Sequence, residues 1–214
     1  MSSDIASIRR NYSLQTLDEA SVDRDAIRQF EKWWQEVIAS GIDEPNAMTL
    51  ATASADGLPA ARIVLLKGVS RKGFVFYTNY DSYKGKQLME NPRACLVFFW
   101  KELERQVRIT GIVEKVSEAE SDAYFQSRPV GSRFGAWVSP QSNIIESREW
   151  LEKKYEDFSR EHATGSINRP DHWGGYLVKP VEIEFWQGRP SRLHDRLEYM
   201  LENDGSWSIR RLAP

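Results

Sequence analysis

The stretch AMTLATASADGLPAARIVLLKG, residues 47–68, decides the fold class of this 214-residue chain. Residues 47–54 favour a β-strand, the turn Ala55-Asp56-Gly57 interrupts it, and residues 61–68 favour a second strand. Two strands joined by so short a turn pair as an antiparallel hairpin. The stretch therefore indicates an antiparallel sheet.

Other segments extend this pattern. The remaining predicted strands are residues 73–79, 94–100 and 105–116, followed by WGGYLV, VEIEFWQG, RLHDRLEYM and SWSIRRL. The run 94–100 is apolar throughout, which predicts burial on both faces, and Gly111 marks a bulge or a close approach of another chain segment. Short strands joined by hairpins, with a few helices inserted, indicate a mainly antiparallel barrel or sandwich.

Four helices are predicted, over residues 23–40, 81–91, 117–127 and 145–161. Asp81 is the expected N-cap of the second helix, and Ser117 with Glu120 forms a capping box at the third. Residues 162–172 favour a loop. We expect residues 1–20, which are polar, to form a mobile N-terminal segment and residues 21–214 to form a single domain.

The composition excludes several classes of protein. A net charge of −2 provides no basic field for nucleic acid or an acidic membrane, and no apolar run reaches the roughly 20 residues of a membrane span. The single cysteine, Cys95, forms no internal disulfide, which fits the reducing cytoplasm. The three histidines have no metal-ligand spacing and no phosphate-loop or dinucleotide motif is present, so we expect no metal site.

Basic side chains recur at positions that suit phosphate. Lys84 lies in the first turn of a predicted helix, where free N–H groups and the helix dipole favour an anion. Tyr124 and Arg128 lie one helical turn apart, and Arg62 and Lys67 open and close RIVLLK. Taken alone, each of these cations is better explained as a solvated surface charge. A cluster of such groups can hold a phosphate dianion.

Strand periodicity makes two further predictions. Arg62 and Lys67 should point to opposite faces of a regular strand, a conflict that two separate phosphates would remove. In the same way Arg192, His194 and Arg196 should share one face of a strand, as cations facing electron-rich ligands or as a basic edge strand that blocks aggregation.

The chain resembles the pyridoxine (pyridoxamine) 5′-phosphate oxidases over most of its length. The matching segments are IRRNY (8–12), RIVLLKG (62–68), FYTNYDSYKGKQ (76–87), NPRACLVFFW (91–100), LERQVRITG (103–111), YFQSRPVGSRFGAWVSPQS (124–142), WGGY (173–176), IEFWQGRPSRLHDR (183–196) and RRLAP (210–214). The resemblance implies an FMN-binding split β-barrel, a homodimer with FMN at the subunit interface, and two phosphorylated ligands.

The resemblance also implies roles for individual residues. The matched cofactor-binding positions are Arg62, Ile63, Val64, Leu65, Leu66, Lys67, Tyr77, Thr78, Lys84, Gln106, Gln141, Ser142, Trp186 and Arg196. The matched substrate-binding positions are Arg9, Arg10, Asn11, Tyr12, Lys67, Tyr124, Arg128, Ser132, Arg192 and His194. Tyr83 is a departure, because the family often has an arginine beside the lysine of the FMN phosphate site.

The implied reaction belongs to vitamin B6 metabolism. Pyridoxine 5′-phosphate or pyridoxamine 5′-phosphate is oxidised at its 4′ carbon to pyridoxal 5′-phosphate, with O₂ as acceptor and H₂O₂ as product. Arg192 and His194 are the catalytic candidates, and either can assist proton movement. Two rival hypotheses are a binding module of the same fold without turnover and a single-stranded nucleic-acid binder that uses aromatic and arginine side chains.

Overall fold

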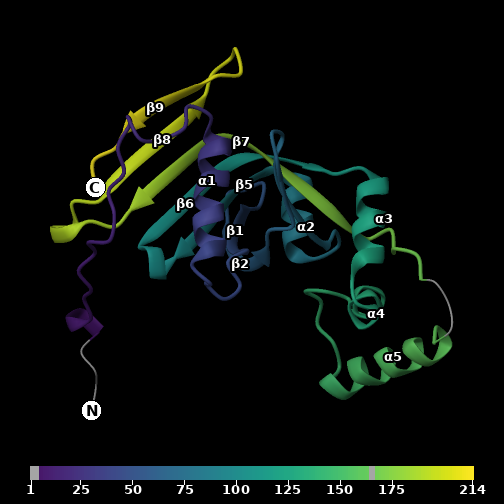
Figure 1. Cartoon of the computed structure of the whole chain (residues 1–214). Helices are drawn as coiled ribbons and strands as arrows, with labels where there is room; N and C mark the ends of the chain where they lie inside the picture. The colour runs from purple at the N-terminus through teal and green to yellow at the C-terminus, as the bar shows by residue number, and fades with distance from the viewer. Residues whose placement is uncertain (1–4, 164–166) are drawn as a thin grey trace. The chain divides into compact units, whose positions relative to one another are not determined.

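The computed structural model describes residues 5–163 and 167–214, which form two compact units (Figure 1). Unit 1 contains residues up to 49 together with 95–110 and 180–214, and unit 2 contains 50–94 and 111–179. Residues 1–4 of the predicted mobile segment and 164–166 of the predicted loop lie outside the described residues. The single domain over 21–214 stays a prediction.

Both units contain strands. They are β1 Ala47–Ala53, β2 Pro59–Leu65, β3 Gly68–Ser70, β4 Gly73–Asn79, β5 Arg93–Trp100, β6 Arg105–Lys115, β7 Trp173–Gln187, β8 Asp195–Leu201 and β9 Trp207–Arg211. The sheet order is β2-β1-β5-β6-β7-β4-β3, and β8 pairs with β7 and β9. The β3–β4, β4–β7, β7–β8 and β8–β9 pairs are antiparallel. The predicted mainly antiparallel β fold with added helices is confirmed.

The described residues also form five α-helices and three short 3-10 turns. They are α1 Ala26–Ala39, α2 Tyr83–Glu90, α3 Glu118–Ser127, α4 Val130–Val138 and α5 Arg148–Glu161, with the 3-10 turns η1 Ile5–Ser7, η2 Lys101–Leu103 and η3 Pro190–Arg192. Within the described ranges, none of these helices is both long and apolar enough to cross a membrane.

Unit 1 has an aromatic core beneath α1. The Asp25 carboxylate caps α1 by accepting the backbone N–H groups of the next turn. Phe30 of α1 packs on Phe98 with ring centroids 5.4 Å apart, and Trp33 packs edge-on against Phe185 at 5.1 Å. These contacts fix α1 against β5 and β7, because large buried rings contribute much of the packing energy of a core.

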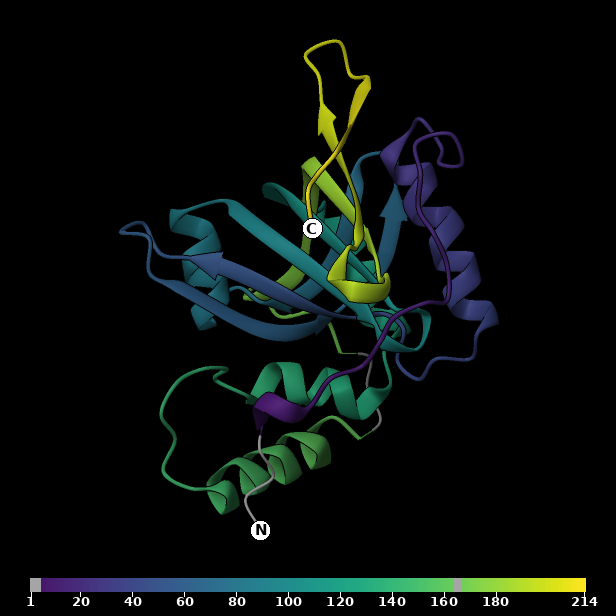
Figure 2. The ribbon, with the colours of Figure 1, turned by 90° about the vertical axis from the view of Figure 1, so that its left-hand side faces the viewer.

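Unit 2 combines β2 to β4 with three helices. The capping box of Ser117 and Glu120 is confirmed at the start of α3. Helices α4 and α5 lie side by side (Figure 2), with Phe134 packed edge-on against Phe158 at 5.7 Å. The close approach predicted at Gly111 is also confirmed, because a Cβ there would overlap the carbonyl oxygen of Lys179.

Several local predictions need correction. The N-cap of α2 is Ser82 and not Asp81, since the Ser82 hydroxyl accepts the N–H of Gly85. Strand β5 is not buried on both faces, because its buried positions alternate and Phe99 is 53% exposed. The last helix begins at Arg148, three residues after its predicted start. The short elements β3 and α4 were not predicted.

Strand β7 is one long strand where two were predicted. Its first half, 173–178, pairs with β4, and 182–187 pairs with β8. Pro180 lies between these two paired stretches, where its missing N–H removes no bond to β4 or β8. The proline therefore marks the change of partner and not the end of the strand.

Two helical glycines provide a matched test of packing in unit 2. A Cβ on Gly85 of α2 would overlap the backbone carbonyl of Tyr80, whereas a Cβ on Gly135 of α4 meets nothing within 4 Å. We expect Gly85→Ala to lower the free energy of unfolding by about 1–3 kcal/mol and Gly135→Ala to raise it by about 0.5–1 kcal/mol. Urea unfolding of both variants measures this, and a Gly85→Ala variant as stable as Gly135→Ala would contradict it.

Candidate functional site

Unit 2 contains a cavity of about 450 Å³. It is lined by Ile63, Val64, Leu65, Lys67, Tyr77, Thr78, Asn79, Lys84, Tyr124, Arg128, Pro129, Ser132, Gln141 and Trp173. The lining thus brings together the end of β2, the C-terminal end of β4, the first turn of α2, the junction of α3 with α4 and the start of β7. Eleven of these residues are among those singled out from the sequence; Asn79, Pro129 and Trp173 were missed, although WGGY contains Trp173.

Lys84 is a buried cation at one side of this cavity. It is 9% exposed, and its Nζ lies 3.3 Å from the Thr78 hydroxyl. Burial lowers the pKa of Lys84, and the positive charge of Arg62 lowers it further. Arg62 donates to the Thr52 hydroxyl at 2.6 Å and to the Leu50 carbonyl at 3.3 Å. No ion pair to a carboxylate is found for either cation among the described residues.

Arg128 is a second cation without a compensating charge. Its guanidinium lies 4.5 Å from the centre of the Trp173 ring, its Nη1 is buried without a hydrogen-bond partner, and burial lowers its pKa. Tyr77 stacks on Tyr124 at 3.8 Å and on Trp173 at 5.6 Å. A buried N–H without a partner is rare in proteins and calls for an explanation such as a ligand.

Unit 1 contains a separate cavity of about 580 Å³. Its lining residues are Ile8, Arg9, Arg10, Asn11, Tyr12, Arg189, Ser191, Arg192 and His194. Four arginines and a histidine meet there, and no carboxylate is among the described lining residues. Just outside the lining, Glu104 lies 3.9 Å from Arg10 and Asp195 lies 3.4 Å from Arg189. This composition suits an anionic or electron-rich ligand.

His194 is held at the base of this second cavity by aromatic contacts. Its ring lies 4.6 Å from Trp186 and 6.1 Å from Tyr12, and its Nδ1 accepts the backbone N–H of Arg189 at 3.1 Å. Burial lowers the pKa of His194, and the like charge of Arg192 lowers it further. The neutral form of the imidazole is therefore favoured, and because Nδ1 accepts an N–H, that form carries its proton on Nε2 and can donate it to a ligand.

The predicted common face of Arg192, His194 and Arg196 is wrong. Residues 190–192 form η3, Arg192 has a left-handed φ of 62°, and β8 begins only at Asp195. Arg196 instead donates two bonds to the Glu184 carboxylate, at 2.8 and 3.1 Å. Its charge is thereby compensated within unit 1.

The parity conflict between Arg62 and Lys67 also disappears. Strand β2 ends at Leu65, so Lys67 lies outside the strand and the alternation does not apply to it. Lys67 lines the unit 2 cavity, whereas Arg62 is not among the lining residues, although its charge lowers the pKa of Lys84.

Some predicted cofactor positions do not line the unit 2 cavity. Tyr83, which is a departure from the family pattern and not a matched position, is 48% exposed at the start of α2. Of the matched positions, Leu66 is buried and Ser142 is exposed with a left-handed φ of 70°. The others are Gln106, Trp186 and Arg196, which belong to unit 1. No group of three or more His, Cys, Asp or Glu side chains in the described ranges is placed to hold a metal ion.

The cations and hydroxyls of the unit 2 cavity fit a phosphorylated ligand. Lys84 supplies a buried ammonium, Arg128 supplies an unpartnered N–H, and Ser132 and Tyr124 add hydroxyls. The stacked rings and the apolar edge of β2 add surfaces for a planar ring system. The donor set is therefore compatible with FMN and with a second phosphorylated aromatic molecule.

Comparisons with known proteins agree with this chemistry. Residues 34–160 match the family described as pyridoxamine 5′-phosphate oxidase, and residues 173–214 match the pyridoxine 5′-phosphate oxidase C-terminal dimerisation region. A pyridoxine/pyridoxamine 5′-phosphate oxidase of Trichormus variabilis is 58% identical over 100% of both chains. One of Cupriavidus metallidurans is 56% identical over 98% of this chain and 99% of the relative.

Solved structures show the same fold. PhzG from Burkholderia lata, in complex with tetrahydrophenazine-1-carboxylic acid, has a TM-score of 0.88 at 28% identity over 94% of this chain and 100% of that chain. A pyridoxamine 5′-phosphate oxidase-related, FMN-binding protein from Nostoc punctiforme has a TM-score of 0.70 at 18% identity, over 86% and 97% of the two chains. The predicted split-barrel fold is confirmed, and this chain belongs to the pyridoxine/pyridoxamine 5′-phosphate oxidase family of enzymes.

Proposed function

We propose that the chain is an FMN-dependent oxidase that converts pyridoxine 5′-phosphate or pyridoxamine 5′-phosphate to pyridoxal 5′-phosphate, with O₂ as acceptor and H₂O₂ as product. The observation that carries the proposal is a pair of cations without a counter-charge on one aromatic-lined cavity: Lys84, which is buried, and Arg128, which is half-buried with a buried Nη1. The hydroxyls of Thr78, Tyr124 and Ser132 line the same cavity and can donate further bonds to a phosphate. The family membership supplies the substrate class.

FMN is proposed to bind along the strand edge of the unit 2 cavity. Lys84 and Arg62, whose charges interact, would hold the FMN phosphate. Residues 63–67, Tyr77, Thr78 and Gln141 would line the flavin ring. Gln106, Ser142, Trp186 and Arg196 remain proposed cofactor contacts in an assembled homodimer, for which the dimerisation region over 173–214 is support. When bound, FMN supplies the redox chemistry, accepting a hydride equivalent and passing electrons to O₂.

The substrate phosphate is proposed to bind Lys67, Tyr124, Arg128 and Ser132. These residues would contact the phosphate and not the reacting carbon. Binding energy from such a non-reacting group can orient the rest of the substrate. Arg192 is proposed to clamp the pyridine ring and His194 to bond its phenolic oxygen. Burial and the charge of Arg192 lower the pKa of His194, which favours the neutral imidazole. Because its Nδ1 accepts the N–H of Arg189, that imidazole carries its proton on Nε2 and can donate it to the phenolic oxygen.

Two further parts of the proposal concern the N-terminal residues 9–12 and the cellular compartment. Arg9 to Tyr12 would lie over bound substrate, since they line the cavity that contains Arg192 and His194. We place the enzyme in the cytoplasm because its single cysteine forms no internal disulfide.

The oxidase assignment predicts peroxide release. Purified protein loaded with FMN should produce H₂O₂ from pyridoxine 5′-phosphate or pyridoxamine 5′-phosphate, measured in a coupled peroxide assay. Arg192→Ala should lower kcat/KM by about 100-fold or more, as expected when a charged substrate contact is lost, while FMN stays bound. Arg128→Met should raise KM for the phosphorylated substrate, whereas Arg133→Met on α4, outside the cavity, should not. A yellow protein without turnover would instead indicate a binding module.

The FMN phosphate site predicts a trade-off between stability and binding at Lys84. Without ligand, Lys84→Met should keep or raise the free energy of unfolding, by about 1 kcal/mol, because it removes a buried charge with no counter-charge. The same change should weaken FMN binding at least about tenfold. Urea unfolding and flavin fluorescence titration measure the two effects. Lys86→Met, an exposed lysine of the same helix, is the control, and a Lys84→Met variant with unchanged FMN affinity would contradict the assignment.

A further inference from the structure

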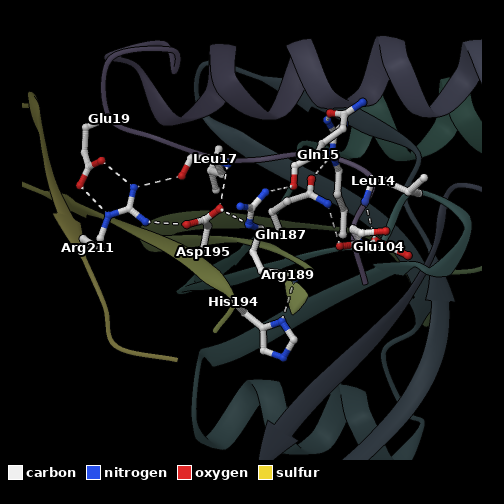
Figure 3. Close-up of polar contacts among 12 residues, drawn as sticks. Leu14, Gln15, Leu17, Glu19, Glu104, Gln187, Arg189, His194, Asp195 and Arg211 are labelled. Carbon is white, nitrogen blue, oxygen red and sulfur yellow. Dashed lines mark hydrogen bonds and ion pairs between the residues drawn. The ribbon is translucent and has the colours of Figure 1, made fainter. Parts of the chain in front are cut away.

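An extended segment near the N-terminus, residues 13–19, is tied to the rest of unit 1 by carboxylates and guanidiniums. We call it the anchor segment; Figure 3 shows most of its contacts. Asp195 accepts the backbone N–H of Leu17 at 3.1 Å, and Arg189 donates to the carbonyl of Gln15 at 3.0 Å. Arg211 of β9 donates to the carbonyl of Leu17 at 3.0 Å. These bonds run mainly to the backbone of the anchor segment, so they fix its path whatever its side chains are.

Glu104 makes the most buried of these contacts. Its side chain is 3% exposed, and its Oε2 accepts the backbone N–H of Ser13 at 2.8 Å and that of Leu14 at 3.1 Å. Its Oε1 lies 3.9 Å from the guanidinium of Arg10. All three groups belong to the N-terminal segment. The segment thus supplies these donors to a carboxylate that is buried beside it, and a buried carboxylate without such donors is an arrangement that proteins avoid.

The backbone holds Glu104 in place from the other side. It follows η2 with a left-handed φ of 55°, unusual for a residue with a side chain. Its carbonyl accepts the N–H of Gly188 at 2.7 Å and the amide of Gln187 at 3.2 Å. Glu104 is therefore a fixed receptor to which the N-terminal segment binds.

Tyr12 directly precedes the two residues that Glu104 holds. Its ring lies 5.8 Å from Trp186, edge to face, and 6.1 Å from His194. It fits into a slot at Gly188, where an added Cβ would lie 2.7 Å from the Cβ and Cγ of Tyr12. The position of Tyr12 over His194 thus depends on where the chain is held at Ser13 and Leu14.

We propose that Glu104 is a positioning residue that acts through the N-terminal segment. By holding Ser13 and Leu14 it sets Tyr12 against Trp186 and His194 at the unit 1 cavity. The proposal rests on the proposed function only in its kinetic part. The sequence segment LERQVRITG contains Glu104, but its role could not be seen there, because its partners are backbone N–H groups that lie about 90 residues away.

The first test measures the hydrogen bonds from the Ser13 and Leu14 amides to Glu104 and does not depend on enzyme activity. Hydrogen–deuterium exchange of the Ser13 and Leu14 amides is compared in the wild type, Glu104→Met, Glu104→Gln and Glu182→Met. Methionine keeps the length of the side chain without an acceptor, whereas glutamine keeps one oxygen that can accept an N–H. Glu182→Met removes an ion pair with Arg108 elsewhere in unit 1 and is the matched control.

Exchange at Ser13 and Leu14 should be about tenfold or more faster in Glu104→Met, intermediate in Glu104→Gln and unchanged in Glu182→Met. Equal protection in the wild type and Glu104→Met would overturn the proposal.

The second test separates positioning from general stability. Glu104→Met should raise KM for pyridoxine 5′-phosphate about tenfold, with kcat within about twofold of the wild type. In a Tyr12→Ala background the same change should have almost no further effect, because the two residues act in series. Glu104→Gln should recover part of the lost affinity.

Independent, multiplicative effects of Glu104→Met and Tyr12→Ala would show that Glu104 does not act through Tyr12, as would an equal rise in KM for Glu182→Met. If the wild type itself produces no peroxide, the proposed function fails, and the exchange measurement still decides the role of Glu104.

Discussion

Buried positive charge without a counter-charge is the constraint on which the site depends. Lys84 and Arg128 lie on one cavity of unit 2; Lys84 is buried and Arg128 is half-buried, and neither has an acidic partner among the described residues. Burial of this kind opposes folding unless something else stabilises the charge. The local fold maintains it nonetheless: Ser82 caps α2 so that Lys84 falls in its first turn, and Trp173 supports the Arg128 guanidinium from one face. An anionic ligand completes such an arrangement.

Several arginines of unit 1 are paired with carboxylates, unlike Lys84 and Arg128. Arg196 is paired with Glu184, Arg105 with Glu36 and Arg211 with Glu19. These ion pairs link segments of unit 1 that are distant in sequence. The pair with Glu184 compensates the charge of Arg196, which strand periodicity had placed on a common face with Arg192 and His194. Of the arginines around His194, Arg10 lies near Glu104 and Arg189 near Asp195, whereas no ion pair is found for Arg9 or Arg192 among the described residues. Arg192 is thus the cation beside His194 whose charge stays available for a ligand.

The predictions from sequence succeeded where local chemistry decides the structure. The hairpin at 47–65, the capping box at Ser117 and the close approach at Gly111 follow from turn, cap and glycine preferences, and all are present. They failed where long-range pairing decides. Pro180 did not end β7, because it falls where the strand changes partner.

The site was predicted with similar success and similar limits. Lys84, Tyr124 and Arg128 were found because residue type and helical spacing indicated a phosphate site, and they line one cavity. Arg192 and His194 were assigned from the family resemblance, while the strand geometry expected for them was wrong. Glu104 could not be identified in advance, since nothing local indicates that a buried carboxylate receives backbone N–H groups from the distant N-terminus.

The central claim is that the unit 2 cations exist to hold phosphate. Titration of the wild-type protein with FMN and with riboflavin, which lacks only the phosphate, tests it most directly. The account predicts that FMN binds at least about 100-fold more tightly than riboflavin, and that this difference shrinks as salt is added. Equal affinities for the two flavins would contradict it.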